Sequence, residues 1–313
     1  MTLEQEIKDK ALALGFNAVG ITDASPIGPE HVEHFEAWLQ AGYAGRMHYM
    51  HRNLQKRVHP AKLLEGAKSV IVVALNYKPP AMATAVGWAP PIVSPSVGRV
   101  AIYAQYEDYH SFIKSLLREL AEFIRMKTDK TQQFKICVDS APLAEKALAV
   151  RAGLGFIGKN HLLIHSQLGP QILLGAIITT VGLCPDGPVD GSCGGCDRCL
   201  RACPTGVLRP DGYLEASRCI SYLTQYETQD LSEGQVGNWL FGCDECLLAC
   251  PFQQTAPVCT NQHFEWHPER DELDLREVLE LTAEEFEAKF HDSPVGKLGL
   301  DLLKSNARRC LKL

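Results

Sequence analysis

Two runs of cysteines in the second half of the chain restrict its fold more than any other feature of the sequence. The first, CGGCDRCLRACPTG, begins at Cys193, holds four cysteines and closes them with a Cys-Pro pair. The second, CDECLLACP, begins at Cys243 and also ends in Cys-Pro. The spacing C-x2-C-x2-C-x3-C-P is typical of bacterial ferredoxins, in which the last cysteine of a run ligates the other of two iron–sulfur clusters. The sequence therefore predicts a segment folded around two four-iron clusters.

The predicted ligands divide into two sets, because each Cys-Pro cysteine crosses to the neighbouring cluster while the two-residue gaps let the others wrap one cluster face. The second run is one cysteine short, and Cys219 in the intervening stretch SRCISYL can supply the missing ligand. The first predicted set is Cys193, Cys196, Cys199 and Cys250, and the second is Cys203, Cys219, Cys243 and Cys246.

Zinc is the alternative metal, since C-x2-C pairs also build tetrahedral zinc sites. Eight cysteines in ferredoxin order with two Cys-Pro endings favour iron–sulfur clusters. By default each remaining cysteine is expected to be a small buried hydrophobic residue, although Cys259 lies near the ligand region. These four are Cys137, Cys184, Cys259 and Cys310.

The composition is ordinary for a globular protein. The 313 residues suggest about two domains, and 46% are hydrophobic. We find no secretory signal and no apolar run long enough to span a membrane, so we expect a cytoplasmic monomer without a membrane partner. Twelve cysteines in that setting indicate metal or redox chemistry rather than disulfides. The net charge of −6 gives no global basic footprint for nucleic acid, which leaves only local patches.

Helix and strand patterns alternate before the cysteines, and they predict an α+β fold. We expect an N-terminal mixed-sheet α/β domain at residues 1–182, a ferredoxin-like domain with two four-iron clusters at residues 183–262, and a short helical C-terminal segment at residues 263–313. Helices are expected at residues 3–14, 29–40, 109–127, 142–151, 273–281, 282–290 (with a capping box of Thr282 and Glu285) and from about 296; strands at residues 16–22, 69–77, 100–106, 134–139 and 172–181; and a Pro-rich loop at residues 78–96.

A second informative stretch, VDSAPLAEKALAVRAGLGFIGKNHLLIH, precedes the cysteines. Its Gly153, Gly155 and Gly158 spell G-x-G-x-x-G, but a dinucleotide fingerprint needs a strand before the glycines and an acid about twenty residues later. Here a helix is expected before them and an apolar strand follows. The glycines are therefore expected to allow a tight turn or the approach of a large flat ligand.

Asp139 ends a predicted buried strand beside Ser140, Ala141 and Pro142. Apolar surroundings would raise the pKa of its carboxyl group and let it hold a proton near neutral pH, as a general acid must. The alternative is that Asp139 caps the following helix.

These stretches together resemble the epoxyqueuosine reductase family over nearly the whole chain: VDSAPLAEKALAVRAGLGFIGKN, CGGCDRCLRACPTG, RCISYLT and GCDECLLACP stand in the family's order. The resemblance implies a cobalamin (corrinoid) cofactor in the N-terminal domain and two [4Fe-4S] clusters, fed by a low-potential donor of the ferredoxin or flavodoxin kind. It implies reduction of epoxyqueuosine to queuosine at the wobble position of tRNA, the last step of queuosine biosynthesis.

The resemblance also implies roles for single residues. Asp139 matches the family's catalytic acid and lies among the cofactor-binding residues, and Arg57 in KRVHP matches a cofactor-contacting arginine. The segment from Lys159 to Gly169 is similar to part of the corrinoid pocket. Its candidate contacts are Lys159, Asn160, His161 and Gly169, although an isolated histidine such as His161 or His165 is more often structural than a cobalt ligand.

A tRNA partner needs a basic surface, and two local patches could neutralise phosphates or could simply be solvated faces. Tyr222 and Tyr226 could stack on anticodon-loop bases or pack around a cluster. Longer family members continue into a helical-repeat domain that helps to grip tRNA, and this domain would begin at about the end of the chain. The first patch comprises Arg46, His48, His51, Arg52, Lys56, Arg57 and His59, and the second comprises Lys297, Lys304, Arg308, Arg309 and Lys312.

Two other functions fit the cysteine runs. A reductive dehalogenase would share the corrinoid and cluster motifs but usually carries a twin-arginine signal, which we do not find here. A non-catalytic electron carrier would need neither a corrinoid nor Asp139, and it would not need the large N-terminal region.

Overall fold

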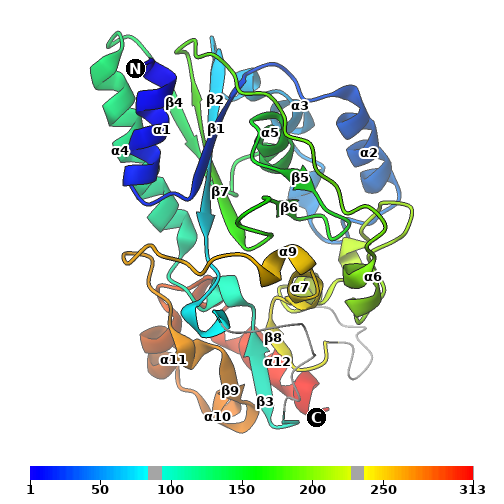
Figure 1. Cartoon of the computed structure of the whole chain (residues 1–313). Helices are drawn as coiled ribbons and strands as arrows, with labels where there is room; N and C mark the ends of the chain where they lie inside the picture. The colour runs from blue at the N-terminus through cyan, green and yellow to red at the C-terminus, as the bar shows by residue number, and fades with distance from the viewer. Residues whose placement is uncertain (84–93, 227–235, 313) are drawn as a thin grey trace.

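In the computed structural model, which describes residues 1–83, 94–226 and 236–312, a four-stranded sheet forms the centre of the N-terminal half (Figure 1). Its strands lie in the order β1 (Ala18–Asp23), β2 (Ser69–Asn76), β7 (Ile172–Thr179) and β4 (Phe134–Cys137), and each pairs antiparallel with its neighbour. Every residue of β2 is buried, because helices cover both faces of the sheet.

Side chains alternate between the two faces of β2, and this divides the hydrophobic core into two layers. Ile71 belongs to one layer, together with the buried faces of α1 (Leu3–Ala13) and α4 (Tyr109–Lys127). Val72 belongs to the other layer, which α5 (Glu145–Arg151) covers. The continuous apolar run of this strand in the sequence thus reflects burial on both sides.

The start of α4 is fixed by its own cap. Asp108 accepts a hydrogen bond from the backbone N–H of His110 at 3.0 Å, as an N-cap residue does. Ile113, Leu117 and Ile124 lie at helical spacing and are fully buried, so the helix cannot rotate about its axis without exposing them. The three residues 108–110 therefore have a defined position at one end of the sheet.

A second, smaller sheet gathers strands from distant parts of the chain. It has the order β8 (Trp239–Phe241), β3 (Val97–Val100), β9 (Glu272–Asp274), with β3 parallel to β8 and antiparallel to β9. Each of the three predicted segments contributes one strand, and the division into three domains stays a prediction. The helices that share its core are α10 (Leu275–Glu280), α11 (Ala283–Phe290) and α12 (Leu300–Leu311).

Short helices that contain a cysteine or directly follow one lie between the two sheets (Figure 1). They are α6 (Arg198–Ala202), α7 (Ile220–Leu223), α8 (Glu245–Leu248) and α9 (Pro251–Gln254). The N-terminal half also contains α2 (Pro29–Gln40), α3 (Leu54–Val58) and the hairpin of β5 (Phe156–Ile157) and β6 (Leu163–Ile164).

The end of β2 is joined to the cysteine region by a buried lysine. Lys78 is 2% exposed, and its ammonium group donates to the backbone carbonyls of Gln253 at 3.0 Å and Ala256 at 2.7 Å. The side-chain amide of Asn76 donates to the carbonyl of Pro257 at 2.8 Å. These bonds fix the end of α9, which begins directly after Cys250, against the large sheet.

Several sequence predictions are confirmed, and others are wrong. The helices at residues 29–40 and 109–127 and the capping box of Thr282 and Glu285 occur as expected. The N-terminal sheet is antiparallel throughout the described residues rather than mixed. The strand expected at residues 100–106 is instead the end of β3 followed by the 3-10 helix η4 (Ile102–Ala104), and α5 begins three residues later than predicted. The helix expected at residues 273–281 begins only at Leu275, because β9 occupies Glu272–Asp274, and the helix expected from about residue 296 begins at Leu300, after a 3-10 turn.

Part of the predicted loop at residues 78–96 lies outside the described residues. Within residues 1–83, 94–226 and 236–312, no helix combines the length and hydropathy needed to cross a membrane. The expected cytoplasmic location stays a prediction.

Replacing Gly155 by alanine is expected to lower the free energy of unfolding by about 2 kcal/mol. Gly155 has a φ of 137°, and a Cβ there would lie 2.1 Å from the carbonyl oxygen of Ile164. Gly187→Ala is the matched control, because a Cβ at this exposed position meets no atom within 4 Å. In thermal unfolding, the midpoint temperature should fall clearly for Gly155→Ala and hardly change for the control. Equal midpoints for the two variants would contradict the close approach.

Candidate active site

Asp139 lies in a tight turn between β4 and α5. Its φ of 54° is in the left-handed region, which few residues other than glycine adopt but which aspartate tolerates. The backbone N–H of Asp139 donates to Oε1 of Glu145 at 2.9 Å, and this bond holds the turn. The N-cap of α5 is Ala144, so the alternative reading of Asp139 as a helix cap was wrong. The carboxylate remains 64% exposed.

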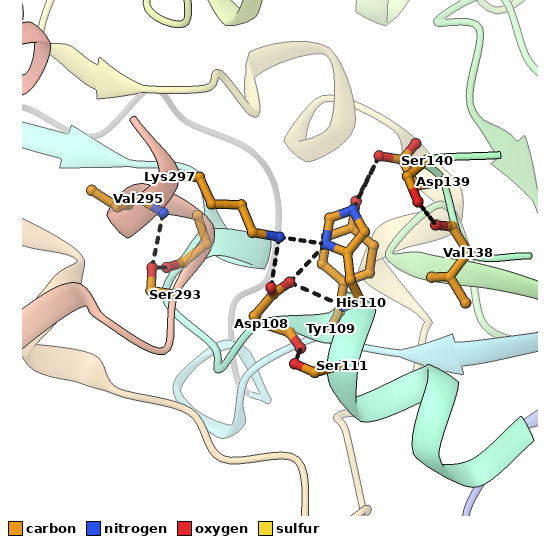
Figure 2. A network of polar contacts seen from close by, with 11 residues as sticks. Asp108, Tyr109, His110, Ser111, Val138, Asp139, Ser140, Ser293, Val295 and Lys297 are labelled. Atoms are coloured by element: carbon orange, nitrogen blue, oxygen red, sulfur yellow. Dashed lines mark hydrogen bonds and ion pairs between the residues drawn. The ribbon is translucent and has the colours of Figure 1, made fainter. Parts of the chain in front are cut away.

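Two consecutive residues at the start of α4 bind the Asp139 carboxylate (Figure 2). The hydroxyl of Tyr109 donates to Oδ2 of Asp139 at 3.3 Å, and Nε2 of His110 lies 3.3 Å from the same oxygen. The other ring nitrogen of His110, Nδ1, lies 2.6 Å from Oδ1 of Asp108. The imidazole thus bridges two carboxylates, and in its protonated form it donates to both.

The charges of this network place its mobile proton on His110. Burial opposes protonation, but the hydrogen bonds to Asp108 and Asp139 raise the pKa of His110 above 6.5. The hydrogen bond from His110 holds the pKa of Asp139 below 3.8, although burial acts the other way. Asp139 is therefore a carboxylate at neutral pH. The expectation that apolar surroundings raise its pKa was wrong, because its nearest neighbours are hydrogen-bond donors.

A third titratable group stands behind the turn. Burial raises the pKa of Glu145 to about 7, and its Oε1 accepts the bond from the backbone of Asp139. Glu145 therefore titrates near neutral pH on one side of Asp139, and His110, with its raised pKa, lies on the other side. Perturbed groups arranged in this way are characteristic of catalytic sites.

Sequence reasoning missed Tyr109, His110 and Glu145. One signal was available: α4 is followed directly by β4, and a helix that returns antiparallel onto the next strand brings its own start to that strand's end. The stretch Asp108-Tyr109-His110 at the predicted helix start could thus have been placed beside Asp139, 29 residues from His110 along the chain.

A cleft of about 240 Å³ opens in front of Asp139. Aromatic side chains form much of its wall, and the C-terminal segment supplies one side. Figure 2 shows Lys297 reaching into this network from that side. The lining residues are Tyr103, Tyr109, His110, Asp139, Gln225, Phe241, Pro294, Lys297 and Leu298.

Arg57 lies near Asp139 on the α3 side. Its backbone carbonyl accepts a hydrogen bond from Ala144 at 3.0 Å, and its side-chain Nε is buried with no hydrogen-bond partner among the described residues. Burial lowers the pKa of this guanidinium, while the neighbouring Tyr49, Glu145 and Asp139 act in the opposite direction. A buried cationic donor that interacts electrostatically with Asp139, a residue of the cleft wall, suits a ligand with oxygen acceptors.

His161 has a φ of 59°, and its carbonyl accepts a hydrogen bond from Nζ of Lys146 at 2.6 Å. Burial and the nearby Lys146 lower the pKa of the imidazole to about 4, so the ring is neutral. The backbone of Tyr213 acts in the opposite direction on this pKa. His161 thus faces protein groups, and its role toward a cofactor stays a prediction.

The other residues predicted from the corrinoid-pocket segment lie against cysteine segments. Nζ of Lys159 donates to the carbonyls of Gly194 and Cys196, each at 2.9 Å, and its backbone N–H points to Sγ of Cys193 at 3.4 Å. Asn160 is buried. Its amide donates to the carbonyl of Cys246 at 3.4 Å, and Gly169 adopts a positive φ close to the carbonyl of Phe252. Cofactor contacts by these three residues stay a prediction.

The first predicted cysteine set shares one cavity. Its walls are apolar apart from the thiols and Asn160, and burial together with Cys193 and Cys250 raises the pKa of Cys199 to about 11. The lining residues are Asn160, Ile164, Cys193, Cys196, Cys199, Cys250, Pro251 and Phe252.

The members of the second predicted set are also neighbours. The pKa of the Cys246 thiol is raised mainly by burial, and the neighbouring thiols of Cys219 and Cys203 raise it further. Cys219 in turn has Cys203 as an electrostatic neighbour, and Cys243 has Cys246 and Cys219. None of the eight forms a disulfide. Among the described residues, no three His, Cys, Asp or Glu side chains converge as ligands of a single metal ion do.

The four remaining cysteines differ from one another. Cys137 is buried as expected, and burial raises its pKa to about 11. Cys184 is exposed, contrary to the expectation, while Cys259 and Cys310 are half-buried.

Tyr222 packs inside the protein. It is buried, stacks on Tyr226 with ring centroids 4.6 Å apart, and its hydroxyl accepts a hydrogen bond from the backbone of Arg46 at 2.7 Å. It also lies in the hydrophobic cluster that contacts Cys219 and Cys243. Of the two readings for this residue, packing near the second cysteine set is the one that the contacts favour.

Two family models match the chain. The one described as "Epoxyqueuosine reductase QueG, DUF1730" covers residues 57–140, which include Arg57, the start of α4 and Asp139. The other, "4Fe-4S double cluster binding domain", covers residues 192–253 and thus all eight predicted ligands. Fold and site together define an iron–sulfur oxidoreductase with an α+β fold.

Curated relatives extend the match over nearly the whole chain. The epoxyqueuosine reductase of Pseudomonas aeruginosa is 37% identical over 96% of this chain and 82% of its own length. That of Leadbetterella byssophila is 37% identical over 96% of both chains. The chain belongs to the epoxyqueuosine reductase family.

Solved structures of the family superpose closely. The Streptococcus thermophilus enzyme matches with a TM-score of 0.86 at 31% identity, over 99% of this chain and 81% of its own. The Bacillus subtilis enzyme, solved with its catalytic aspartate loop swung out of the active site, matches with a TM-score of 0.87 at 30% identity, over 99% of this chain and 81% of its own. A complex with an epoxyqueuosine-modified tRNA-Tyr stem loop gives 0.88 at 31% identity over 99% and 80%.

Replacing Asp108 by asparagine is expected to lower the pKa of His110, because one of the two carboxylates that stabilise the imidazolium is removed. An NMR titration of the imidazole in the full chain measures this pKa directly. Asp129→Asn is the control, since Asp129 is exposed and its carboxylate accepts from the backbone of Thr131. If Asp108→Asn leaves the pKa of His110 where it is, the bridging arrangement is contradicted.

Proposed function

We propose that the protein reduces the epoxide of epoxyqueuosine at the wobble position of tRNA to give queuosine, the last step of queuosine biosynthesis. Family membership over nearly the full chain supports this reaction. The structural observation that carries the proposal is the Asp139 carboxylate, which lies 3.3 Å from Nε2 of His110 at the wall of an open cleft. Removing an epoxide oxygen as water consumes two electrons and two protons, so the site must supply both.

We propose that residues 183–262 hold two [4Fe-4S] clusters and that residues 1–182 hold cobalamin, with residues 263–313 as a helical segment that closes the site. Free thiols in two neighbouring groups suit the clusters, and the buried donor of Arg57 beside an open cleft suits the polar side chains of a corrinoid. When bound, the corrinoid supplies a strongly reducing metal centre and the clusters supply its electrons one at a time. The proposed ligand sets are Cys193, Cys196, Cys199 and Cys250, and Cys203, Cys219, Cys243 and Cys246.

The surroundings of the two sets differ, and this difference suggests an order for the electrons. In the first set, Cys193 and Cys196 are partly exposed beside the exposed Gly194. The second set adjoins Asp244, and both Asp244 and Asp139 are electrostatic neighbours of Tyr103. A low-potential donor would therefore deliver electrons to the first set, and the second set would pass them toward the cleft.

The proton path is short. Asp139 would carry a proton to the leaving oxygen, and His110, 3.3 Å away, would replace that proton from its own Nε2. Tyr109 donates to the same carboxylate oxygen and keeps it oriented toward His110. Asp139 serves as a relay whose proton comes from the imidazolium, because its own pKa is too low to store one at neutral pH.

The proposed partner is the anticodon stem loop of tRNA, as in the solved family complex with a modified stem loop. The first basic patch, at residues 46–59, runs from the loop after α2 through η1 (His48–Met50) and α3, and its Arg57 reaches the neighbourhood of Asp139. Its exposed members could neutralise phosphates next to the cleft. A cytoplasmic monomer remains the expected form.

Asp139→Asn is expected to slow queuosine formation by at least 100-fold, since an amide cannot relay a proton. The measurement is nucleoside analysis of tRNA from a deletion strain carrying each variant, followed by single turnovers with the reconstituted enzyme. Asp129→Asn is the control and should restore queuosine fully. Normal queuosine in the Asp139→Asn strain would rule out the relay. Normal queuosine in the deletion strain itself would rule out the function, unless a second enzyme substitutes.

Cys193→Ser and Cys203→Ser are each expected to remove one cluster, because each proposed set loses a thiolate ligand. Iron content should fall by about half, with a matching loss of the reduced-cluster signal in electron paramagnetic resonance. Cys184→Ser is the control, because Cys184 is exposed and belongs to neither set. Unchanged iron content in either of the first two variants would contradict the ligand assignment.

A further inference from the structure

Lys297 belongs to the second basic patch by sequence, but the structure turns it toward the proton-donating network. Its Nζ lies 2.6 Å from Oδ2 of Asp108 and 3.3 Å from Nδ1 of His110 (Figure 2). The side chain is 58% exposed and lines the cleft in front of Asp139. Its contact is therefore with the imidazole–carboxylate pair, at a point 187 residues away in the chain.

The segment that carries Lys297, the 3-10 helix η7 (Pro294–Lys297), is held firmly against the start of α4. The buried Ser293 donates from Oγ to the carbonyl of Ala104 at 2.9 Å and accepts from the backbone of Val295 at 3.1 Å. The backbone N–H of Asp108 donates to the carbonyl of Asp292. Lys297 is thus presented by an anchored turn.

A buried arginine adds a second anchor. Arg270 is 3% exposed and donates to the carboxylate of Asp292 and to the carbonyls of Lys289 and Tyr106. It ties residues 289–292 to the chain just before α4. A displacement of η7 would break several buried hydrogen bonds, so the distance between Lys297 and Asp108 is determined by the fold.

The carboxylate of Asp108 has one oxygen for each partner. Oδ1 accepts from the backbone and the ring of His110, while Oδ2 accepts from Lys297. An ammonium group only donates, so Lys297 cannot receive the ring proton. It can fix the plane of the Asp108 carboxylate, and through that plane it can fix the ring of His110 with Nε2 toward Asp139.

We propose that Lys297 is a positioning residue of the proton relay, which holds Asp108 and thereby orients His110 toward Asp139. The proposal rests on the proposed function, and it gives the C-terminal segment a part in the chemistry. The groups that face His110 are Asp108, Tyr109, Asp139, Glu145 and Lys297.

The charge of Lys297 has a consequence of definite sign. The ammonium charge of Lys297 opposes protonation of His110, whereas the carboxylate of Asp108, next to Lys297, favours protonation of His110. Without this charge, Asp108 would bind the imidazolium more strongly and His110 would keep its proton to higher pH. The lysine thus makes the proton easier to release to Asp139.

The test compares Lys297→Met with Lys297→Arg in the reconstituted holoenzyme, in single turnovers with an epoxyqueuosine-containing stem loop across pH 5.5 to 9. For Lys297→Met we expect the maximum rate to fall about tenfold, the basic limb of the profile to move to higher pH, and the KM for the stem loop to stay within about twofold. Lys297→Arg should retain the wild-type profile. Lys130→Met, an exposed lysine beyond the end of α4, is the control for loss of one charge.

An NMR titration of His110 in the full chain provides a readout that does not depend on turnover. Lys297→Met should raise the pKa of His110, and Lys130→Met should not. A raised KM with an unshifted pH profile and an unshifted imidazole would show that Lys297 is a phosphate contact and would overturn the proposal. If the wild-type enzyme fails to reduce the stem loop, the proposed function fails while the imidazole shift still decides the role of Lys297.

Discussion

The ammonium group of Lys78 sits at the junction on which the rest of the molecule depends. A buried charge is costly unless polar groups surround it, and here the backbone carbonyls at the end of α9 do so. Those carbonyls immediately follow the second Cys-Pro pair. The hydrogen bonds of Lys78 therefore fix the position of Cys250, a proposed cluster ligand, relative to the large sheet.

Two chain segments supply most of the active site. One helix start supplies Asp108, Tyr109 and His110, and its cap hydrogen bond uses the same Asp108 oxygen that binds the imidazole. One strand end supplies Asp139, held in a left-handed turn by Glu145. Because α4 runs antiparallel into β4, the two ends coincide without any long loop. The direct connection between α4 and β4 thus brings His110 next to Asp139.

Local patterns predicted local structure well. The apolar run of β2, the stripe of α4 and the capping box of α11 each follow from side-chain spacing alone, and the structure bears them out. Cys193, Cys196 and Cys199 line one cavity with Cys250, as their spacing suggested, and the two ligand sets stay a prediction. Tertiary context decided the rest.

The strand expected after Val100 fails because the following alternation of apolar residues serves a 3-10 turn whose members contact different clusters. The pKa of Asp139 depends on His110, and the direction of Lys297 depends on hydrogen bonds of Ser293 and Arg270. These relations join residues far apart in the chain. A single sequence carries no pairwise signal that could reveal them.

The small sheet has a consequence for how the protein is made. Its middle strand, β3, leaves the ribosome early, but its partner β8 follows only after the first cysteine run, and β9 only after the second. The four-stranded sheet is complete once β7 has emerged and can form first. Before β8 and β9 have emerged, both edges of β3 are unpaired, and unpaired strand edges favour association with other chains. Nascent chains should therefore depend on chaperones during the interval between β3 and β9, and the network around Asp139 closes last of all.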